Sequence, residues 1–224
     1  MITALIGSNG TIGSSILNNM SFTYVYNSDN IKQFKDHKFD LVVCAAPSGN
    51  RLTANKNPEH DLASIEKLID ALGGTSIKKL VLISTVDTVA YPNSSYGENR
   101  LKLENFVKIN NDDYHILRLS TLIGKSIKKN VLYDLKHNLF IDKINPDSVV
   151  QWCPLDTLHT DIKYVINNNI KEINLVSEPI ANKNIIAEFF NVKIDAKSNP
   201  THYDIQPYRY TKQDIYTAIQ NYLQ

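Results

Sequence analysis

The hydrophobic positions in the first half of the chain alternate between short apolar runs and longer stretches with helical spacing. The apolar runs have the length of β-strands and lie at 2–6, 22–26, 41–45, 79–84 and 115–119. The run at 41–45 is apolar at every position, which is typical of a strand that is buried on both faces of a parallel sheet.

Stretches with a 3.6-residue period separate these runs and predict helices at 12–20, 31–34, 62–72 and 96–107. Asp61 is the expected N-cap of the third helix, and Gly73 and Gly74 are expected to end it. Strands that alternate with helices, without hairpin turns, predict an α/β fold with a Rossmann-type, doubly wound parallel sheet.

The regular alternation weakens after Gly124. The pattern there predicts helices at 128–137, 155–166, 184–190 and 213–223, and strands at 149–152 and 173–176. We expect a single domain in which the Rossmann core covers 1–125 and is rejoined by about 155–180. The remaining parts, 126–154 and 181–224, are expected to form a small interwoven substrate-binding lobe.

A glycine-rich loop lies between the first predicted strand and the first predicted helix. Gly7 permits a tight turn, Gly10 lets the backbone approach a pyrophosphate, and Gly13 lets the helix pack closely on the strand. The helix N-terminus adds N–H groups for a phosphate. This context favours a dinucleotide site over an ordinary turn. Its expected residues are Gly7, Ser8, Asn9, Gly10, Thr11, Ile12 and Gly13, with Ala45 and Ala46 after the 41–45 strand.

The G-x-x-G-x-x-G spacing of this loop resembles the short-chain dehydrogenase/reductase superfamily, particularly its extended branch of epimerases, dehydratases and reductases. Tyr96, Gly97, Arg100 and Glu104 form a Tyr-Gly-x-x-basic-x-x-x-Glu pattern that is similar to the same branch. The resemblance covers most of residues 1–125 and implies an NAD(P)-binding oxidoreductase.

The residue that reads the adenosine ribose is expected about 20 positions after the first glycine, where Asn27 stands. Asn27 and the adjacent Ser28 can both hydrogen-bond either a hydroxyl or a phosphate. Asp29 favours NAD and Lys32 favours NADP, so the sequence leaves both cofactors open.

The resemblance also implies a hydroxyl side chain at the end of a buried strand, followed by Tyr-x-x-x-Lys at the start of a helix. Ser84 and Thr85 stand at the first place and Tyr96 at the second, whereas Arg100 replaces the lysine. A tyrosine that acts as a base near neutral pH needs its pKa lowered by about 3 units, or about 4 kcal/mol. Arg100 lies one helical turn away and keeps the required positive charge, but its planar fork relays no protons. Either Arg100 supplies the electrostatic part and holds the ribose, or the fold has kept the cofactor site and lost redox turnover.

Asp87 follows the same strand end and is a further candidate. It is placed either to act as an acid near the nicotinamide, as in some dehydratases and epimerases of the branch, or to cap the next turn. The interval between Thr85 and Tyr96 is short for an extended-branch enzyme, which weakens the expectation of a full sugar-nucleotide pocket.

Substrate contacts are expected after Gly124. Lys129 and Asn130 precede a predicted helix and can meet a pyrophosphate, or form a solvated helix end. Trp152, the only tryptophan, can stack on a sugar or pack in the core. Arg209 lies between two tyrosines and is a candidate phosphate clamp.

The composition of the chain bears on whether it binds nucleic acid, a membrane or a metal. With 24 basic and 23 acidic residues the formal net charge is +1, which does not favour a nucleic-acid partner. No apolar segment is long enough to cross a bilayer, and the N-terminal segment reads as a strand rather than a signal peptide. Cys44 and Cys153 form neither a disulfide framework nor a metal site, and the histidines lack ligand spacing. We expect a cytoplasmic protein without a metal.

These observations predict an NAD(P)-dependent oxidoreductase or epimerase that acts on a nucleotide-activated sugar or a similar hydroxylated metabolite, with Tyr96 as acid/base. The resemblance implies a homodimer. The alternative is a non-catalytic NAD(P)-binding sensor or scaffold of the same fold, which the arginine at position 100 favours.

Overall fold

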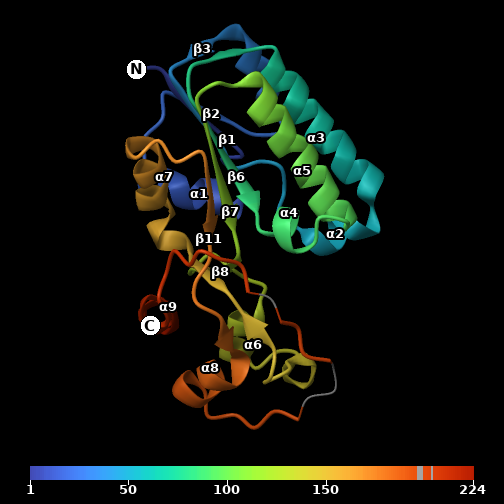
Figure 1. The fold of residues 1–224 in the computed structure, drawn as a ribbon, viewed down its shortest axis with the longest axis vertical. Coiled ribbons are helices and arrows are strands. Elements are labelled where there is room, and N and C mark those ends of the chain that lie inside the picture. Colours follow the sequence, from blue (N-terminus) through green and yellow to red (C-terminus); the bar gives the residue numbers. More distant parts are fainter. Residues whose placement is uncertain (196–198, 203) are drawn as a thin grey trace. The chain divides into compact units, whose positions relative to one another are not determined.

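A computed structural model describes residues 1–195, 199–202 and 204–224. The chain divides into two compact units (Figure 1). Unit 1 comprises Met1–Arg118 and Thr157–Ile173, and unit 2 comprises Leu119–Asp156 and Asn174–Gln224. The expected lobe segments 126–154 and 181–224 lie in unit 2.

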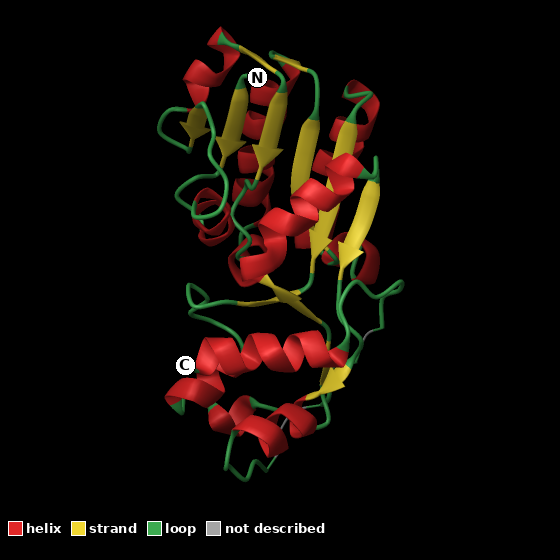
Figure 2. Cartoon of the chain, turned by 90° about the vertical axis from the view of Figure 1, so that its left-hand side faces the viewer, coloured by secondary structure: helices red, strands yellow, loops and turns green. Residues whose placement is uncertain are grey.

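A six-stranded sheet forms the centre of unit 1 (Figure 2), in the order β11-β7-β6-β4-β1-β2. Its strands are β1 (Thr3–Ile6), β2 (Tyr24–Tyr26), β4 (Leu41–Cys44), β6 (Leu80–Thr85), β7 (Tyr114–Leu119) and β11 (Glu172–Leu175). Both neighbours of β1 run parallel to it, and Leu5 lies opposite Val25 on one side and Val43 on the other. The Rossmann-type fold predicted from the alternating pattern is confirmed, and the run predicted at 173–176 joins the main sheet as β11. Two short strands, β3 (Lys38–Phe39) and β5 (Ser76–Ile77), pair separately.

The order of the strands places a topological switch between β1 and β4. From β1 the chain moves outward to β2, and it then crosses back over β1 to form β4. In open α/β sheets the crevice at such a switch, outside the carboxyl ends of the strands, is where ligands bind. The glycine loop follows β1 directly, and Ala45 and Ala46 follow β4.

Helices cover both faces of this sheet. In Figure 1, α3 (Pro58–Gly73) and α5 (Ser95–Asn110) lie side by side on one face, and α1 (Thr11–Leu17) and α7 (Leu158–Asn167) lie on the other. The core between the sheet and the first helix pair consists of apolar side chains, among them Val42, Leu80, Leu82, Ile65, Leu72, Leu103 and Val107. The chain between β4 and β7 adds α2 (Arg51–Lys56) and α4 (Asp87–Ala90), while η1 (Ile31–Asp36) follows β2.

The predicted N-cap of the third helix is wrong. The helix α3 begins at Pro58 with Asn57 as its N-cap, so Asp61 lies inside the first turn. Proline favours the first helical position because its fixed φ suits a helix and no N–H is needed there. The predicted end is confirmed, since α3 ends at Gly73 and Gly74 is the C-cap.

Unit 2 is built from short pieces. β8 (Thr121–Ile123) pairs with β10 (Trp152–Pro154), and β9 (Val149–Val150) pairs with β12 (Ile180–Ala181). Its helices are α6 (Val131–His137), α8 (Asn182–Phe189) and α9 (Lys212–Leu223), with the 3-10 turns η2 (Ile141–Lys143) and η3 (Leu155–Thr157). Across the part of the chain that the structure describes, no helix combines the length and the apolar character that a membrane span needs.

Candidate active site

The glycine loop is packed so tightly that side chains are excluded at two positions. Gly7 has a positive φ of 91°, and a Cβ there would lie 2.7 Å from the carbonyl oxygen of Ala45. A Cβ on Gly13 would lie 2.1 Å from the carbonyl oxygen of Gly7. The loop therefore closes on itself and against the end of β4, as the glycine roles predicted from the sequence require.

The outer side of the loop is open by contrast. Asn9, Gly10 and Thr11 are exposed, and a Cβ on Gly10 would meet only the Gly7 carbonyl oxygen, at 3.3 Å. Gly10 is the N-cap of α1 and provides no side chain to accept the first N–H groups of the helix. A tight glycine cradle that leaves backbone N–H groups accessible fits the pyrophosphate of a dinucleotide.

Asn27 directly follows β2 and is held in a tight turn. Its side-chain oxygen accepts the N–H of Asp29 at 2.8 Å, and its own N–H donates to the side-chain oxygen of Asn30 at 2.7 Å. Because the Asn27 oxygen is engaged in the turn, contact with an adenosine ribose would fall to its amide nitrogen or to Ser28.

Tyr96 lies in the first turn of α5 and is buried, with only 6% of its surface exposed. Its N–H donates to the side-chain oxygen of Asn55 in α2 at 2.9 Å, which fixes the start of the helix. A Cβ on Gly49 would lie 3.9 Å from the phenolic oxygen, so the 47–50 segment passes beside the hydroxyl. Burial raises the pKa of Tyr96, while the charge of Arg100 and the side-chain hydrogen bonds with Thr85 and Arg100 oppose the rise.

The structure separates the two candidate hydroxyls at the end of β6. The side chain of Thr85 acts on Tyr96 and lowers the pKa of its phenol, while its Oγ1 accepts the N–H of Asp87 at 3.2 Å. Ser84 instead donates to the carboxylate of Glu104 at 2.6 Å. Glu104 is fully buried and also binds the guanidinium of Arg118. Ser84 therefore belongs to the ion-pair network of Glu104, whereas the sequence placed it as a candidate partner of Tyr96.

Asp87 is the first residue of α4, and its carboxylate faces a cation. Nε of Arg51 lies 3.1 Å from the Asp87 carboxylate, and the guanidinium carbon lies 4.6 Å from the centroid of the Tyr91 ring. Burial raises the pKa of Asp87, and Arg51 opposes that shift. The negative charge of Asp87 in turn raises the pKa of Tyr96, which places the two side chains in one electrostatic site. Arg51 was not foreseen because it lies in a polar stretch without periodicity.

Arg100 is buried and tightly held. Its guanidinium forms a bidentate salt bridge with the carboxylate of Asp61, at 2.8 and 2.9 Å, and donates a hydrogen bond to the carbonyl oxygen of Ser48 at 2.7 Å. The guanidinium carbon also lies 4.3 Å from the centroid of the Tyr96 ring. The i, i+4 spacing therefore brings Tyr96 and Arg100 together as predicted. Both terminal nitrogens of the Arg100 guanidinium, however, already donate hydrogen bonds to Asp61 or Ser48.

The four predicted substrate residues fall in unit 2 in different environments. Asn130 is the N-cap of α6: its oxygen accepts the Tyr133 N–H at 2.9 Å and its nitrogen donates to the Leu122 carbonyl at 2.7 Å. Its side chain therefore stabilises the helix start instead of facing a ligand. Trp152 is fully buried, which corresponds to the core alternative and leaves no face for stacking on a sugar.

The other two substrate candidates remain accessible. Lys129 is exposed beside the start of α6. Arg209 is partly buried, and its backbone N–H donates to the Val176 carbonyl at 2.8 Å.

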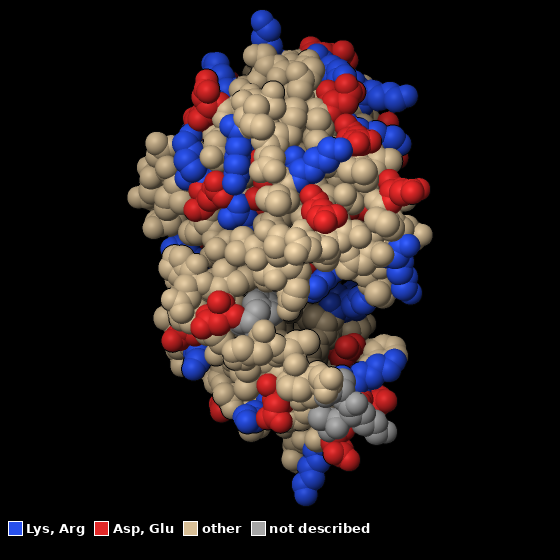
Figure 3. All heavy atoms as spheres, turned by 45° about the vertical axis from the view of Figure 1, so that its right-hand side comes forward, with Lys and Arg blue, Asp and Glu red and all other residues tan. Residues whose placement is uncertain are grey.

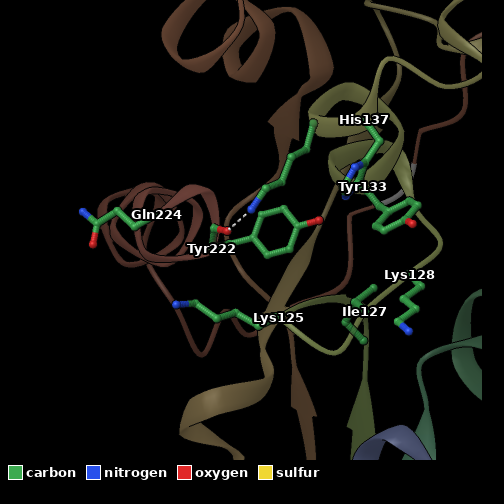
Figure 4. A pocket seen from close by; sticks show the side chains of 8 residues that line it. Lys125, Ile127, Lys128, Tyr133, His137, Tyr222 and Gln224 are labelled. Carbon is green, nitrogen blue, oxygen red and sulfur yellow. Dashed lines mark hydrogen bonds between the residues drawn. The ribbon is translucent and has the colours of Figure 1, made fainter.

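Unit 2 also holds a basic and aromatic pocket of about 370 Å³ (Figure 4). It is lined by Lys125, Ile127, Lys128, Tyr133, Lys136, His137, Tyr222 and Gln224. The Lys136 ammonium group donates to the Tyr222 carbonyl oxygen at 2.7 Å and lies 4.6 Å from the centroid of the Tyr222 ring. The rings of Tyr133 and His137 lie 4.3 Å apart. Cationic groups beside aromatic faces suit a ligand that carries both a ring and negative charge.

The surface charges and the two cysteines bear on which partners and metals this chain could bind. Figure 3 shows basic and acidic side chains intermixed over the drawn face. Cys44 and Cys153 are both buried and unbridged, and burial raises the pKa of Cys44 to about 12. Within residues 1–195, 199–202 and 204–224, no group of three or more His, Cys, Asp or Glu side chains is arranged to hold a metal ion.

No protein-family model and no curated protein sequence matches this chain. Solved structures do match. The dTDP-4-dehydrorhamnose reductase of Bacillus anthracis, in complex with NADP, is 18% identical over 94% of this chain and 88% of its own, with a TM-score of 0.66. An NAD-dependent NDP-hexosamine 5,6-dehydratase of tunicamycin biosynthesis is 13% identical over 97% and 90%, with a TM-score of 0.70.

The L-threonine dehydrogenase of Phytophthora infestans is 12% identical over 100% of this chain and 98% of its own, with a TM-score of 0.73. At these identities the likeness shows a shared fold. The reductase and the dehydratase belong to the classes that the motif resemblance named, whereas the threonine dehydrogenase acts on a different kind of substrate. The fold therefore spans several substrate classes.

Proposed function

We propose that this chain binds NAD or NADP at the carboxyl ends of β1 and β4. The observation that carries the proposal is the glycine cradle, in which Gly7 and Gly13 admit no side chain while Gly10 opens toward solvent. The cradle lies at the topological switch of the sheet, and neighbours with the same fold use NADP or NAD. A nicotinamide bound there would supply or accept a hydride.

We further propose an oxidoreductase or epimerase in which Tyr96 exchanges a proton with the substrate oxygen. In this proposal the nearby hydroxyl of Thr85 orients the phenol, and Arg100, one helical turn along α5, lies against the ring. The Asp87–Arg51 pair sets the charge beside them. The Tyr96 hydroxyl group and its Thr85 partner are the groups expected to contact the reacting oxygen.

The proposed substrate is a nucleotide-activated sugar or a similar hydroxylated metabolite. Two observations support this class: the reductase and dehydratase neighbours act on such compounds, and the pocket of unit 2 combines lysines with aromatic rings. Lys125 and Lys128 would meet the diphosphate, and the tyrosines Tyr133 and Tyr222 would meet the base.

The proposal is tested by cofactor binding and by turnover. Gly10→Val adds bulk on the exposed side of the loop without a disallowed φ, so we expect at least a tenfold loss of NADH and NADPH affinity in calorimetry. Because its Cβ would lie 3.3 Å from the Gly7 carbonyl oxygen, urea unfolding checks that the variant is folded under the conditions of the binding experiment. Gly73→Ala, at the end of α3, is the control and should bind as the parent does. A parent protein that binds neither cofactor, or a Gly10→Val variant with undiminished affinity, contradicts the cofactor site.

For turnover, Tyr96→Phe should lower the rate by about 10²–10⁴-fold on any active substrate from a panel of UDP- and dTDP-sugars, while cofactor affinity is retained. Tyr26→Phe, at another buried tyrosine of unit 1, is the matched control. Unchanged turnover in Tyr96→Phe would show that the acid/base assignment is wrong.

The engagement of Arg100 favours a second candidate, a non-catalytic NAD(P)-binding sensor or scaffold. Its guanidinium is bound to Asp61 and Ser48 and so has little capacity left for a ribose. Cofactor binding with no oxidation or reduction across the panel would support this candidate. Turnover gained by Arg100→Lys would instead identify a degraded enzyme.

A further inference from the structure

Asp61, a buried carboxylate outside the Tyr96-x-x-x-Arg100 motif, is bonded to Arg100. Asp61 in α3 and Arg100 in α5 have side chains that are only 9% and 5% exposed, and they meet through two hydrogen bonds. Asn99, adjacent to Arg100, donates to the same carboxylate at 2.9 Å. Burial opposes the charged form of Asp61, but the bonds from Arg100 and Asn99 hold its pKa below the ordinary value. Asp61 is therefore a fixed negative charge behind the guanidinium.

This arrangement restricts what Arg100 can do for Tyr96. A lone buried cation within about 4–6 Å lowers the pKa of an acid by about 1–3 units. Here the guanidinium carbon that lies 4.3 Å from the centroid of the Tyr96 ring belongs to a group bonded to a carboxylate, and the negative charge of that carboxylate offsets part of the positive charge. The pair behaves more like a dipole than like the free ammonium of a lysine.

The other charges near Tyr96 are also paired. Asp87, at the start of α4, opposes ionisation of the phenol, and Arg51 from α2 is bonded to Asp87. From α3, the exposed His60 acts on Asp61. The site thus contains two cations and two carboxylates around one buried phenol. The net result is a Tyr96 pKa above its ordinary value, with burial as the largest cause.

We propose that Asp61 is the positioning residue of this site: it locks Arg100 against the Tyr96 ring and offsets its charge, so that Tyr96 serves as a proton donor in the reduction of a ketone or an aldehyde. This inference rests on the proposed function. With a reduced nicotinamide bound, the cofactor would supply the hydride to the carbonyl carbon, and Tyr96 would supply the proton to the carbonyl oxygen. Tyr96 would then regain its proton from solvent, so that carbonyl compound, reduced cofactor and one proton become alcohol and oxidised cofactor.

The test follows Tyr96 by NMR in the full chain without cofactor. Tyrosine labelled with ¹³C at Cζ reports phenol ionisation, and the Tyr96 signal is identified by its loss in Tyr96→Phe. We expect Tyr96 to titrate above the ordinary tyrosine pKa of about 10. Titration of Tyr96 below that ordinary value would overturn the proton-donor role, whatever the protein turns out to bind.

The role of Asp61 is tested by Asp61→Asn, which leaves the guanidinium without its counter-charge. We expect Tyr96 to titrate at least one pH unit lower than in the parent. Glu66→Gln is the matched control, because Glu66 and Lys102 form an exposed pair across the same two helices at 2.8 Å, and it should leave the titration unchanged. A folded Asp61→Asn variant with an unmoved Tyr96 titration would reduce Asp61 to a structural residue and overturn the proposal.

A double variant covers the case in which Asp61→Asn does not fold. Asp61→Asn with Arg100→Gln replaces the ion pair by two amides and removes both charges together. If Asp61 offsets Arg100, the Tyr96 titration in this variant stays within about one pH unit of the parent. A rise of more than one unit would show that the Arg100 charge acts on Tyr96 without an offset, and the proposal would fail. Cofactor binding is measured separately, so its loss bears on the proposed function and not on Asp61.

Discussion

At the level of single residues, two buried arginines of unit 1 each meet a buried carboxylate of another element. Arg100 meets Asp61 between α5 and α3, and Arg118 meets Glu104 between β7 and α5. Arg118 also reaches Glu172 in β11, where Lys108 of α5 joins the network. Removing one partner of a buried pair leaves an uncompensated charge and costs about 3–5 kcal/mol. These pairs fix the helix α5, which carries Tyr96, against its neighbours.

His115 makes the stability of unit 1 depend on pH. Its side chain is fully buried in β7, and its Nδ1–H donates to the Ile170 carbonyl at 2.6 Å. Burial lowers the pKa of His115, and Lys79 and Lys171 add to the shift. Below about pH 6.5 the unfolded chain binds a proton at this residue that the folded chain does not. We therefore expect the contribution of neutral His115 to the free energy of unfolding to be fully present above about pH 6.5. Below that pH the free energy of unfolding should fall by up to about 1.4 kcal/mol per pH unit, until the pH reaches the pKa of His115 in the folded chain.

The measurement is urea unfolding of the parent and of His115→Gln between pH 7.5 and 5.5. The variant should lose part of the acid-dependent decline, whereas His60→Gln, at an exposed histidine of the same unit, should keep it. Equal pH dependence in the parent and His115→Gln would contradict this account.

At the level of elements, the start of α6 shows how one polar residue is used. Asn130 satisfies the Tyr133 N–H at one end of its side chain and the Leu122 carbonyl at the other. It therefore joins the helix to the strand β8. The sequence predicted this helix to begin at 128, three residues before its observed start at Val131. An N-cap and a ligand contact use the same residue types, so the sequence left the role of Asn130 open.

Asn130→Ala should destabilise unit 2 by about 1–2 kcal/mol, because both hydrogen bonds are lost. Urea unfolding measures the change. Lys129→Ala, at the exposed neighbouring position, should alter stability by less than about 0.5 kcal/mol. If Asn130→Ala instead leaves stability unchanged and weakens nucleotide-sugar binding, the capping role is wrong.

At the level of the whole molecule, cofactor binding should increase the free energy of unfolding. A ligand that binds only the folded state adds about 2.7 kcal/mol at a concentration of 100 times Kd. We expect NADH or NADPH to raise the melting temperature of the parent protein by several degrees. Thermal scans over a concentration series measure this effect and show which of the two cofactors binds more tightly.

Gly10→Val is the control for this experiment, because its weaker cofactor binding should make the shift clearly smaller at the same concentrations. An equal shift in the parent and in Gly10→Val would mean that the stabilising ligand binds elsewhere. No shift with either cofactor would contradict the proposed function.

The sequence by itself determined the strands around the glycine loop, the end of α3 at Gly73, the strand β6 to within one residue at each end, and the Rossmann-type class. These features follow from local periodicity, turn chemistry and glycine geometry, which a few neighbouring residues encode. It also brought Tyr96 and Arg100 together, because an i, i+4 spacing is sufficient to place two side chains on one helix face.

Only the tertiary structure decided what Arg100 touches. Its partner Asp61 is 39 positions away on another helix, and the pattern that made Asp61 look like an N-cap contains no sign of that pairing. The same holds for Arg51 with Asp87 and for Ser84 with Glu104, which meet across elements brought together by the parallel sheet. The glycine motif thus determined from sequence the close-packed loop between β1 and α1. The charge around the tyrosine was decided by long-range packing, because burial and ion pairing depend on which elements meet.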